Sequence, residues 1–232
     1  MEAIVLAGGL GTRLRGVVDD VPKPMAPVHG RPFLALVLDQ LVDAGFKTAI
    51  FAAGYRHEAI RSHFGDAYLG LELLYSVESE PLGTGGAIRQ ACEQTDARDL
   101  FVLNGDTYLE LDFRAMMEAH VRASSQFSLA ICRVPDVARY GALELHDDIV
   151  HGFLEKGRSG PGWINGGTYI LGPAMRARLR PQGVFSFEHD LLAPEVESIR
   201  PLAFRASGRF IDIGIPEDYA RAQQLFSRRL AQ

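Results

Sequence analysis

The amino-acid sequence predicts an α/β protein in which a mostly parallel sheet is covered by helices on both faces and joined by a smaller antiparallel portion. Two patterns indicate this class. Apolar β-type runs alternate with amphipathic stretches up to about residue 112, and short β-type segments separated by turn residues follow. The chain has 232 residues, is 47% hydrophobic and shows no internal repeat or linker. We therefore expect a single domain over residues 1–232.

The first half alternates strands and helices in a regular order. We expect strands at 2–7, 48–53, 71–76 and 100–104, and helices at 32–44, 57–64 and 84–95. Ligands of parallel sheets bind beside the carboxyl ends of the strands. The residues that follow three of these strands, namely Gly8, Gly54 and Asp106, should therefore face one crevice.

The second half changes character after a helix at 113–123 and an apolar strand at 127–133. Short strands are expected at 142–146, 149–153 and 163–171, followed by a helix at 187–196, strands at 202–205 and 209–213, and a last helix that begins at Pro216. A proline in the first turn, followed by Glu217 and Asp218, is typical of a helix N-terminus. These segments indicate an antiparallel portion laid against the first half.

The composition excludes several classes of protein. The net charge of −5 favours neither nucleic acid nor an anionic membrane as a partner, and the apolar runs are too short to span a bilayer. Cys92 and Cys132 do not form a disulfide framework, and the residues after Met1 do not resemble a secretory signal. We expect a cytoplasmic protein, and the sequence leaves its oligomeric state open, including a homo-oligomer.

A glycine loop follows the first strand, over Gly8-Gly9-Leu10-Gly11-Thr12-Arg13, with Lys23 ten residues after it. Glycines expose backbone N–H groups, and the two cations add positive charge, so the loop suits a polyphosphate. It matches neither the Walker spacing nor the dinucleotide fingerprint, in which a third glycine would replace Leu14. A plain glycine turn is the alternative.

Two aspartates stand at the ends of apolar strands. Asp106 follows Leu100 to Leu103, and Asp212 lies within Phe210-Ile211-Asp212-Ile213. Each alone could be a turn or helix cap, but two carboxylates together with phosphate oxygens are what a magnesium ion usually takes. The pair predicts a Mg²⁺ site.

Six ordered motifs that span nearly the whole chain resemble the sugar-phosphate nucleotidyltransferases, also called nucleotide-sugar pyrophosphorylases. They are Gly8 to Leu14 with Pro22 to Pro27, Glu80 to Ala87, Asn104 to Thr107, Phe153 to Lys156, Asn165 to Tyr169, and Phe210 to Tyr219. Within this family the loop Leu14 to Pro22 and the stretch Pro27 to Leu34 are most similar to the D-glycero-α-D-manno-heptose 1-phosphate guanylyltransferases.

The resemblance implies a Rossmann-like three-layer α/β/α sandwich with a mixed, mostly parallel sheet and a small antiparallel sugar-binding β portion. It also implies a reaction, in which a sugar 1-phosphate attacks the α-phosphorus of a nucleoside triphosphate and releases pyrophosphate. Residues 1–112 would mainly bind the nucleotide, and residues 113–232 would mainly bind the sugar phosphate and supply the second metal carboxylate. The substrates would be GTP and the heptose 1-phosphate, with mannose 1-phosphate guanylyltransferases and N-acetylmuramate 1-phosphate uridylyltransferases as alternatives. Two more remote alternatives are a nucleotide-sensing module without catalysis and a nicotinamide-dependent oxidoreductase.

The resemblance carries roles to individual residues. The catalytic residues would be Arg13 on the leaving pyrophosphate, Lys23 near the α-phosphate, and Asp106 and Asp212 on Mg²⁺. The nucleotide-binding residues would be Leu6, Gly8, Gly9, Gly11, Thr12, Arg13, Glu78, Gly83 and Thr84. The sugar-phosphate-binding residues would be Asn104, Tyr140, Gly141, Glu155, Lys156, Asn165, Thr168 and Glu188.

Two glutamates have competing interpretations. Glu78 occupies the position where the family reads the base, and its carboxylate suits the adjacent N1–H and N2–H₂ donors of guanine. This favours GTP over CTP but separates GTP from UTP only weakly, and a solvated loop glutamate is the alternative. Glu188 could contact the sugar or serve as a charge at a helix N-terminus.

Overall fold

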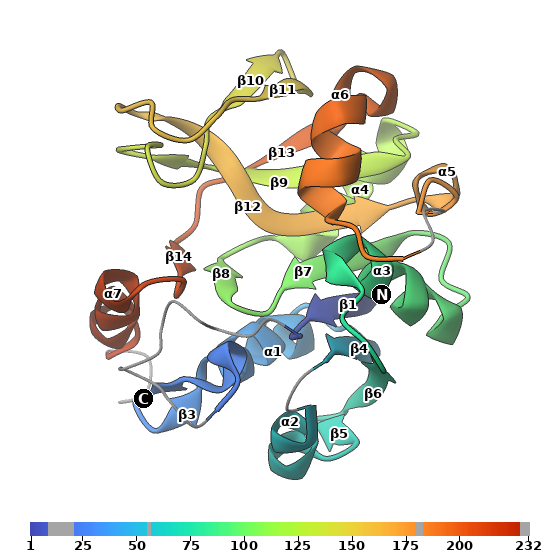
Figure 1. Ribbon diagram of the computed structural model, residues 1–232, viewed down its shortest axis with the longest axis vertical. Helices are drawn as coiled ribbons and strands as arrows, with labels where there is room; N and C mark the ends of the chain where they lie inside the picture. Colours follow the sequence, from blue (N-terminus) through green and yellow to red (C-terminus); the bar gives the residue numbers. More distant parts are fainter. Residues whose placement is uncertain (9–20, 55–56, 180–182, 228–232) are drawn as a thin grey trace.

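A ten-stranded sheet runs through the part of the chain that the computed structural model describes, which comprises residues 1–8, 21–54, 57–179 and 183–227. From one edge to the other the strands are β10 (Leu143–His146), β11 (Ile149–Phe153), β13 (Leu202–Ala206), β9 (Phe127–Val134), β12 (Gly162–Leu171), β7 (Leu100–Asn104), β1 (Glu2–Leu6), β4 (Thr48–Ala53), β6 (Leu71–Val77) and β5 (Ala67–Tyr68). The strands β5, β11 and β12 run opposite to β1. The sheet is therefore mixed, and one sheet spans both halves of the sequence (Figure 1).

Helices cover both faces of this sheet. One face packs against α1 (Phe33–Asp43), α2 (His57–Phe64), α4 (Phe113–Arg122) and α7 (Pro216–Phe226). The other face packs against α3 (Gly83–Ala91), α5 (Pro173–Arg176), the π-helical turn η4 (Phe187–Leu192) and α6 (Ala193–Ile199). The predicted layered α/β fold is confirmed.

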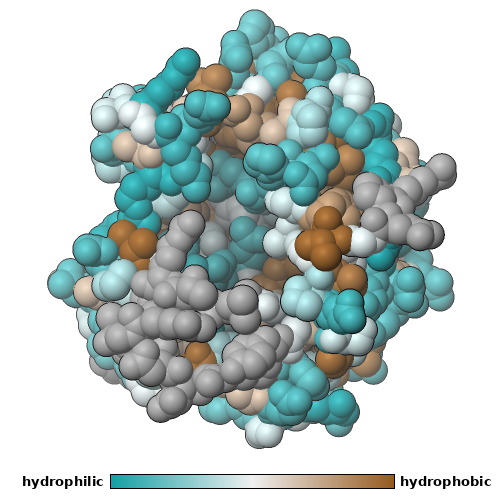
Figure 2. All heavy atoms as spheres, in the orientation of Figure 1, coloured by the Kyte–Doolittle hydropathy of each residue, from teal (hydrophilic) through white to brown (hydrophobic). Residues whose placement is uncertain are grey.

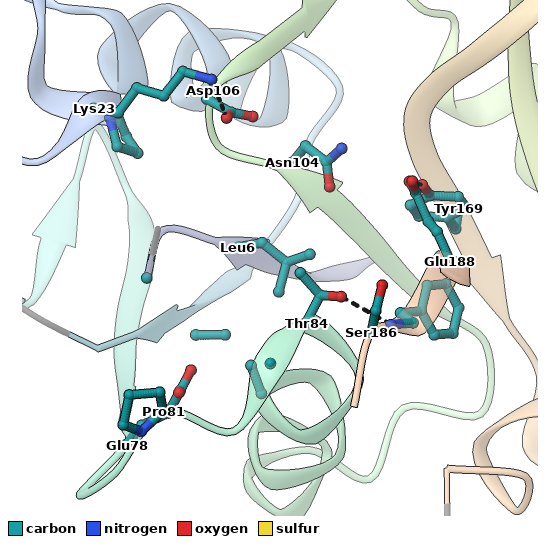
Figure 3. A pocket seen from close by; sticks show the side chains of 16 residues that line it. Leu6, Lys23, Glu78, Pro81, Thr84, Asn104, Asp106, Tyr169, Ser186 and Glu188 are labelled. Carbon is teal, nitrogen blue, oxygen red and sulfur yellow. Dashed lines mark hydrogen bonds and ion pairs between the residues drawn. The ribbon is translucent and has the colours of Figure 1, made fainter. Parts of the chain in front are cut away.

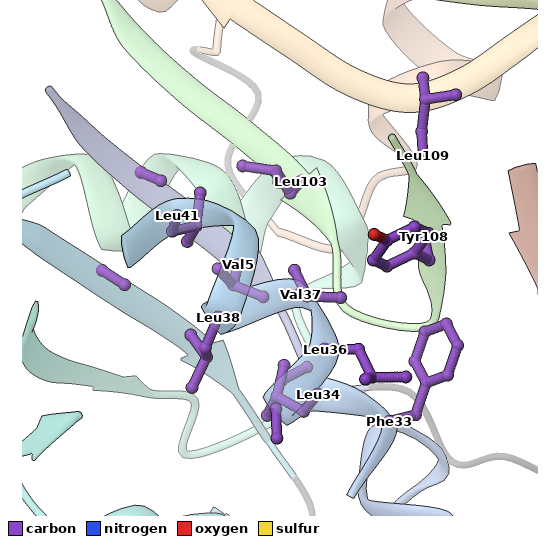
Figure 4. Close-up of a cluster of buried hydrophobic side chains, with 14 of the residues drawn as sticks. Val5, Phe33, Leu34, Leu36, Val37, Leu38, Leu41, Leu103, Tyr108 and Leu109 are labelled. Atoms are coloured by element: carbon purple, nitrogen blue, oxygen red, sulfur yellow. The ribbon is translucent and has the colours of Figure 1, made fainter. Parts of the chain in front are cut away.

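Strand alternation builds the two cores. In β1, Ala3 and Val5 belong to the core beneath α1, whereas Ile4 between them belongs to the core beneath α3. Figure 4 shows the first core, where Leu34, Val37 and Leu41 of α1 lie against β1 and β7. Because the central strands are buried on both faces, they read as continuous apolar runs in the sequence.

Several short elements lie outside the predicted pattern. They are the 3₁₀ turns η2 (Lys23–Met25) and η3 (Cys92–Gln94), the strand pair β2 (Pro27–Val28) with β3 (Arg31–Pro32), and β8 (Thr107–Leu109), which pairs with β14 (Phe210–Asp212). Two or three residues are too few to show a periodicity. The β8–β14 pair matters most, because it joins two distant parts of the chain beside the cavity described below.

The helix predicted at 187–196 is divided between η4 and α6. Pro194 lacks an N–H and so leaves the carbonyl of Asp190 without its usual helical donor. The N–H of Ala193 instead donates to the carbonyl of Glu188, five residues back. The wider turn follows from the position of this proline.

Hydrophobic residues on the face shown in Figure 2 form separate patches between hydrophilic ones. Among the described residues, no helix has the length and apolar content that crossing a bilayer requires.

The aromatic cluster of the first core gives a stability prediction. Phe101 in β7 is fully buried, and its ring contacts those of Phe46 and Phe113 at centroid distances of 5.2 and 5.5 Å. We expect Phe101→Ala to lower the free energy of unfolding by about 3–5 kcal/mol, measured by urea denaturation. The control Val121→Ala, at a side chain 59% exposed, should change it by no more than about 0.5 kcal/mol. An equal effect of both variants would contradict this packing.

Candidate active site

A cavity of about 440 Å³ lies where the parallel strands end. Leu6 of β1, Ala52 of β4 and Asn104 of β7 form its floor, and β12 and the turn before η4 form the opposite wall. The residues that line it are Leu6, Gly8, Lys23, Pro24, Ala52, Glu78, Pro81, Gly83, Thr84, Ala87, Asn104, Asp106, Tyr169, Ser186, Phe187 and Glu188. The predicted crevice at the carboxyl ends of the strands is thus present.

Polar side chains gather at three corners of this cavity (Figure 3). Lys23 and Asp106 form one corner, Glu78 beside Pro81 forms a second, and Glu188 with Tyr169 forms a third. Leu6, Thr84 and Asn104 lie between them. The cavity can therefore hold an elongated ligand with different polar groups at its ends.

At the first corner a lysine bridges two carboxylates. The Nζ of Lys23 lies 2.5 Å from Oδ2 of Asp106 and 3.5 Å from Oδ1 of Asp212. Asp106 sits in the turn between β7 and β8, while Asp212 ends β14 and pairs with Thr107 in the β8–β14 ladder. This ladder brings the two aspartates, which are 106 positions apart in the sequence, to one cation.

The electrostatics of this corner favour a further positive charge. Burial raises the pKa of the Asp212 carboxyl, and the nearby Asp106 carboxylate raises it as well, whereas Lys23 and the Gly214 N–H lower it less. The single lysine thus does not offset burial and the neighbouring carboxylate together. Two adjacent carboxylates, of which Asp106 lines the cavity, are suited to a divalent cation that also takes phosphate oxygens. The described residues hold no cluster of three or more His, Cys, Asp or Glu side chains that could bind a metal by themselves.

Glu78 forms the second corner at the end of β6. Its Oε2 accepts the backbone N–H of Leu82 at 2.8 Å, and its own N–H donates to the carbonyl of Ala53. A Cβ built on Gly8 would lie 3.5 Å from Oε1 of Glu78, so glycine leaves that oxygen uncovered. The carboxylate is therefore fixed by its loop and still has lone pairs that face the cavity.

The third corner is a hydrogen-bonded triad. Nδ2 of Asn165 donates to the Tyr169 hydroxyl and to Oε1 of Glu188, both at 2.8 Å, and the Tyr169 hydroxyl donates to the same Glu188 oxygen. Burial raises the pKa of Tyr169 well above its usual value, and the Glu188 carboxylate raises it further, so the hydroxyl stays protonated. Asn165 is itself held by the Gly167 N–H. Glu188 thus has one oxygen fixed by two donors and the other free for a ligand.

Backbone hydrogen bonds tie the second corner to the third. The N–H of Gly85 donates to the carbonyl of Phe185, the N–H of Phe185 donates to the carbonyl of Leu82, and the N–H of Phe187 donates to Oγ1 of Thr84. A Cβ on Gly85 would lie 2.0 Å from the Phe185 ring, which explains the glycine. The start of α3 and the segment before η4 therefore form one continuous wall.

Four of the predicted sugar-phosphate residues lie on two loops next to each other, outside the lining of the cavity. Gly141 has a positive φ of 83°, and a Cβ there would lie 2.9 Å from the Leu154 carbonyl and 3.8 Å from Cγ of Lys156. Tyr140 precedes this glycine, and Glu155 precedes Lys156. The structure thus brings the Tyr140-Gly141 and Glu155-Lys156 motifs together.

The remaining predicted residues are placed as follows. Gly9, Gly11, Thr12 and Arg13 lie outside the described residues. Thr168 is only 4% exposed, and since successive strand residues face opposite sides, it points to the other face of the sheet from Tyr169. The sugar contact of Thr168 stays a prediction.

Sequence reasoning missed Tyr169, Ser186 and Phe187, which line the cavity. Tyr169 and Phe187 resemble ordinary core aromatics in the sequence. The polar Asn165 four positions before Tyr169, and Glu188 directly after Phe187, were the signals that could have identified them.

A family model described as nucleotidyl transferase matches residues 2–229. Together with the mixed sheet and the cavity at its strand ends, this match defines the class. The chain belongs to the nucleotidyl transferase family.

Particular relatives are closely similar to this chain. The D-glycero-alpha-D-manno-heptose 1-phosphate guanylyltransferase of Aneurinibacillus thermoaerophilus is 43% identical over 97% of each chain. The protein of the same name from Campylobacter jejuni is 40% identical over 94% of this chain and 97% of its own. The crystal structure of HddC from Yersinia pseudotuberculosis complexed with GMP-PN has 41% identity and a TM-score of 0.85, and the match covers 97% of this chain and 99% of that one. The resemblance found in the motifs is confirmed.

The Asn165 triad gives a pH-dependent prediction. In Asn165→Asp a second carboxylate faces Glu188 in place of a donor, so we expect the free energy of unfolding at pH 7 to fall by about 1–2 kcal/mol. The like charges raise the folded-state pKa of the pair, so the deficit is present above that pKa and shrinks as the pH falls towards about 4. Urea denaturation at both pH values measures this.

The control is the double variant Asn165→Asp with Glu188→Gln, in which an amide donor faces the new carboxylate. Its stability at pH 7 should return close to that of the parent protein. A deficit of equal size at pH 7 and pH 4, or no rescue by the second change, would contradict the hydrogen bonding described for this corner.

Proposed function

We propose that this protein transfers a guanylyl group from GTP to D-glycero-α-D-manno-heptose 1-phosphate. An oxygen of the sugar phosphate attacks the α-phosphorus, the bond from that phosphorus to the bridging oxygen breaks, and pyrophosphate leaves with both electrons of the bond. The single observation that carries the proposal is one cavity with Lys23 and Asp106 at one corner, Glu78 at a second and Glu188 at a third, with Asp212 beside Lys23. The heptose enzymes that are 43% and 40% identical to the chain support the choice of substrates.

The chemistry needs positioning more than a base. A phosphate monoester, with a second pKa of about 6, is already mostly a dianion near neutral pH. The difficulty is to bring two polyanions into line and to stabilise the charge that develops. Among the described residues that line the cavity, Lys23 supplies a cation at one corner, and the carboxylates of Glu78 and Glu188 at the other two can hold the base and the sugar in line with it.

At the nucleotide end, Glu78 reads the base. One of its oxygens already accepts the Leu82 N–H, but a carboxylate oxygen has two lone pairs, so paired acceptance from guanine N1–H and N2–H₂ stays available. Leu6, Gly83 and Thr84 line the adjoining wall. Gly8 to Thr12 and Arg13 would hold the triphosphate and the leaving pyrophosphate.

At the centre, Asp106 and Asp212 fit a Mg²⁺ ion. The fit rests on the donor chemistry of two carboxylates that lie on either side of Lys23. When bound there, Mg²⁺ would neutralise charge on the phosphates. Lys23 then orients the α-phosphate or the incoming phosphate from the same corner.

At the sugar end, the free oxygen of Glu188 accepts hydrogen bonds from sugar hydroxyls. The side-chain amide of Asn104 can both donate to them and accept from them. The hydrogen-bonding atoms of Asn165 and Tyr169 are used to hold Glu188 in place, so these two residues position the carboxylate that contacts the sugar. Lys156, beside Gly141, holds the sugar phosphate. Tyr140, Gly141 and Glu155 complete this side.

A substrate panel tests the proposal. The purified protein with Mg²⁺ is offered GTP, UTP, CTP and ATP, each with heptose, mannose and N-acetylmuramate 1-phosphates, and released pyrophosphate is measured. We expect the GTP and heptose pair to react fastest. Faster turnover with another pair would show that the assigned substrates are wrong. Absence of turnover with every pair would show that the protein does not catalyse the proposed reaction.

The two aspartates should be essential for turnover. We expect Asp106→Asn and Asp212→Asn each to lower kcat by on the order of 10²–10³, because each removes a charge that holds the cation at the phosphates. The unfolding transition should remain cooperative. Asp66→Asn, at an exposed ion pair with Arg61, is the control and should leave kcat within about twofold. Near-normal rates in both active-site variants would remove the metal assignment.

Glu78→Gln should alter base selection more than catalysis. The amide replaces one acceptor with a donor, which opposes guanine N1–H, so the preference for GTP over UTP in kcat/KM should fall about tenfold or more. Glu80→Gln, two positions along the same loop and exposed, is the matched control. An unchanged preference in Glu78→Gln would show that the base is read elsewhere.

A further inference from the structure

Asp218 is a buried carboxylate that the reaction described above does not use. It lies in the first turn of α7, is 2% exposed, and accepts hydrogen bonds from Nη1 of Arg139 and, at 2.8 Å, from Nη1 of Arg221. A charge that served only the helix N-terminus could stay in water. Burying a carboxylate is costly unless it is paired, so the two arginines account for its position.

The two arginines differ in what they connect. Arg221 is three residues away on α7 itself, and its side chain is 60% exposed. Arg139 is 79 positions away, on the loop that carries Tyr140 and Gly141. The Arg139 pair therefore joins α7 to this loop, whereas the Arg221 pair stays within one helix.

The Arg139 loop is bonded in turn to the loop of Lys156. The N–H of Leu154 donates to the carbonyl of Ala142 at 2.8 Å, and the N–H of Gly157 donates to the carbonyl of Ala138 at 2.9 Å. A displacement of residues 138–142 would therefore carry Glu155 and Lys156 with it. The two loops form a unit, which we call the double loop, over residues 136–142 and 154–160.

A second contact joins the double loop to the strand of Asp212. The Tyr140 ring packs edge to face on Phe210 of β14, with centroids 5.4 Å apart, and the Arg139 guanidinium lies 5.1 Å from the Tyr140 ring centre. Phe210 is two residues before Asp212, and α7 begins four residues after Asp212. The ion pair and the ring contact thus hold the double loop to the segment that carries Asp212.

We infer that Asp218 and Arg139 are positioning residues that fix the double loop, and with it Lys156, relative to Asp212. The inference rests on the proposed function, because it assigns the double loop to the sugar phosphate. Asp218 and Arg139 touch no substrate. Their ion pair sets the distance between the cation that holds the sugar phosphate and the carboxylate on the metal side.

Arg139→Gln is the decisive variant, because it releases the double loop while Asp218 keeps Arg221 as a partner. We expect the KM for the sugar 1-phosphate to rise about tenfold, with the KM for the nucleotide changed by less than about twofold. Arg139→Lys, which keeps the charge, should recover part of the loss. Arg221→Gln is the matched control, because it removes the other arginine of the same carboxylate, and both KM values should stay within about twofold.

Non-additivity gives an independent check. Asp218→Asn combined with Arg139→Gln should raise the sugar-phosphate KM no more than the worse single variant, since both changes break the same bond. Three results would overturn the inference while the proposed function stands. They are an equal rise of both KM values in Arg139→Gln, unchanged KM values in Arg139→Gln, or an effect of Arg221→Gln as large as that of Arg139→Gln.

Hydrogen exchange separates this inference from the proposed function. The backbone amides of Leu154 and Gly157 should exchange faster in Arg139→Gln than in the parent protein, and not in Arg221→Gln. If the parent protein turned over no sugar 1-phosphate, the proposed function would fail, and faster exchange would still support the link between α7 and the double loop. Unchanged exchange in Arg139→Gln would overturn that link whatever the activity.

Discussion

The structure depends on the enforced proximity of Asp106 and Asp212. Two partly buried carboxylates repel each other, and they stay together because the short β8–β14 ladder fixes their backbones and Lys23 lies between them. Lys23 reaches them because η2 places it beside the carboxyl end of the central strand β7. Under the proposed function, this concentration of negative charge would favour a ligand that brings its own cation, as a nucleoside triphosphate with magnesium does.

The rest of the cavity is arranged around this corner by one continuous sheet. Parallel strands end at the cavity, and the antiparallel strand β12 crosses beside them to supply Tyr169 and Asn165 at its third corner. A purely parallel sheet would place only strand ends at the ligand. Inserting one reversed strand next to β7 lets side chains from the middle of a strand face the same space.

The long, strongly patterned elements and the main charged residues could be predicted from the sequence, because they depend on local periodicity and on position at a strand end. Asp106 and Asp212 stand out as acids within apolar strands, and Glu78 follows a strand directly. The Asp218 pair with Arg139 could not be predicted, since 79 residues separate the partners and each alone reads as an ordinary surface charge. Thr168 shows the converse: it precedes Tyr169 in a regular part of β12 and so faces the other side of the sheet, which a motif that is contiguous in sequence does not reveal.

The bonds between the start of α3 and the segment before η4 constrain how such a protein can change its choice of sugar. Ser186 to Glu188 border the proposed sugar side, yet the backbone of Phe185 and Phe187 is bonded to Leu82, Thr84 and Gly85 on the proposed nucleotide side. Grafting this segment from a relative with another acceptor would also displace the wall against the base. If these roles hold, a redesign for a new donor–acceptor pair would have to exchange both stretches together.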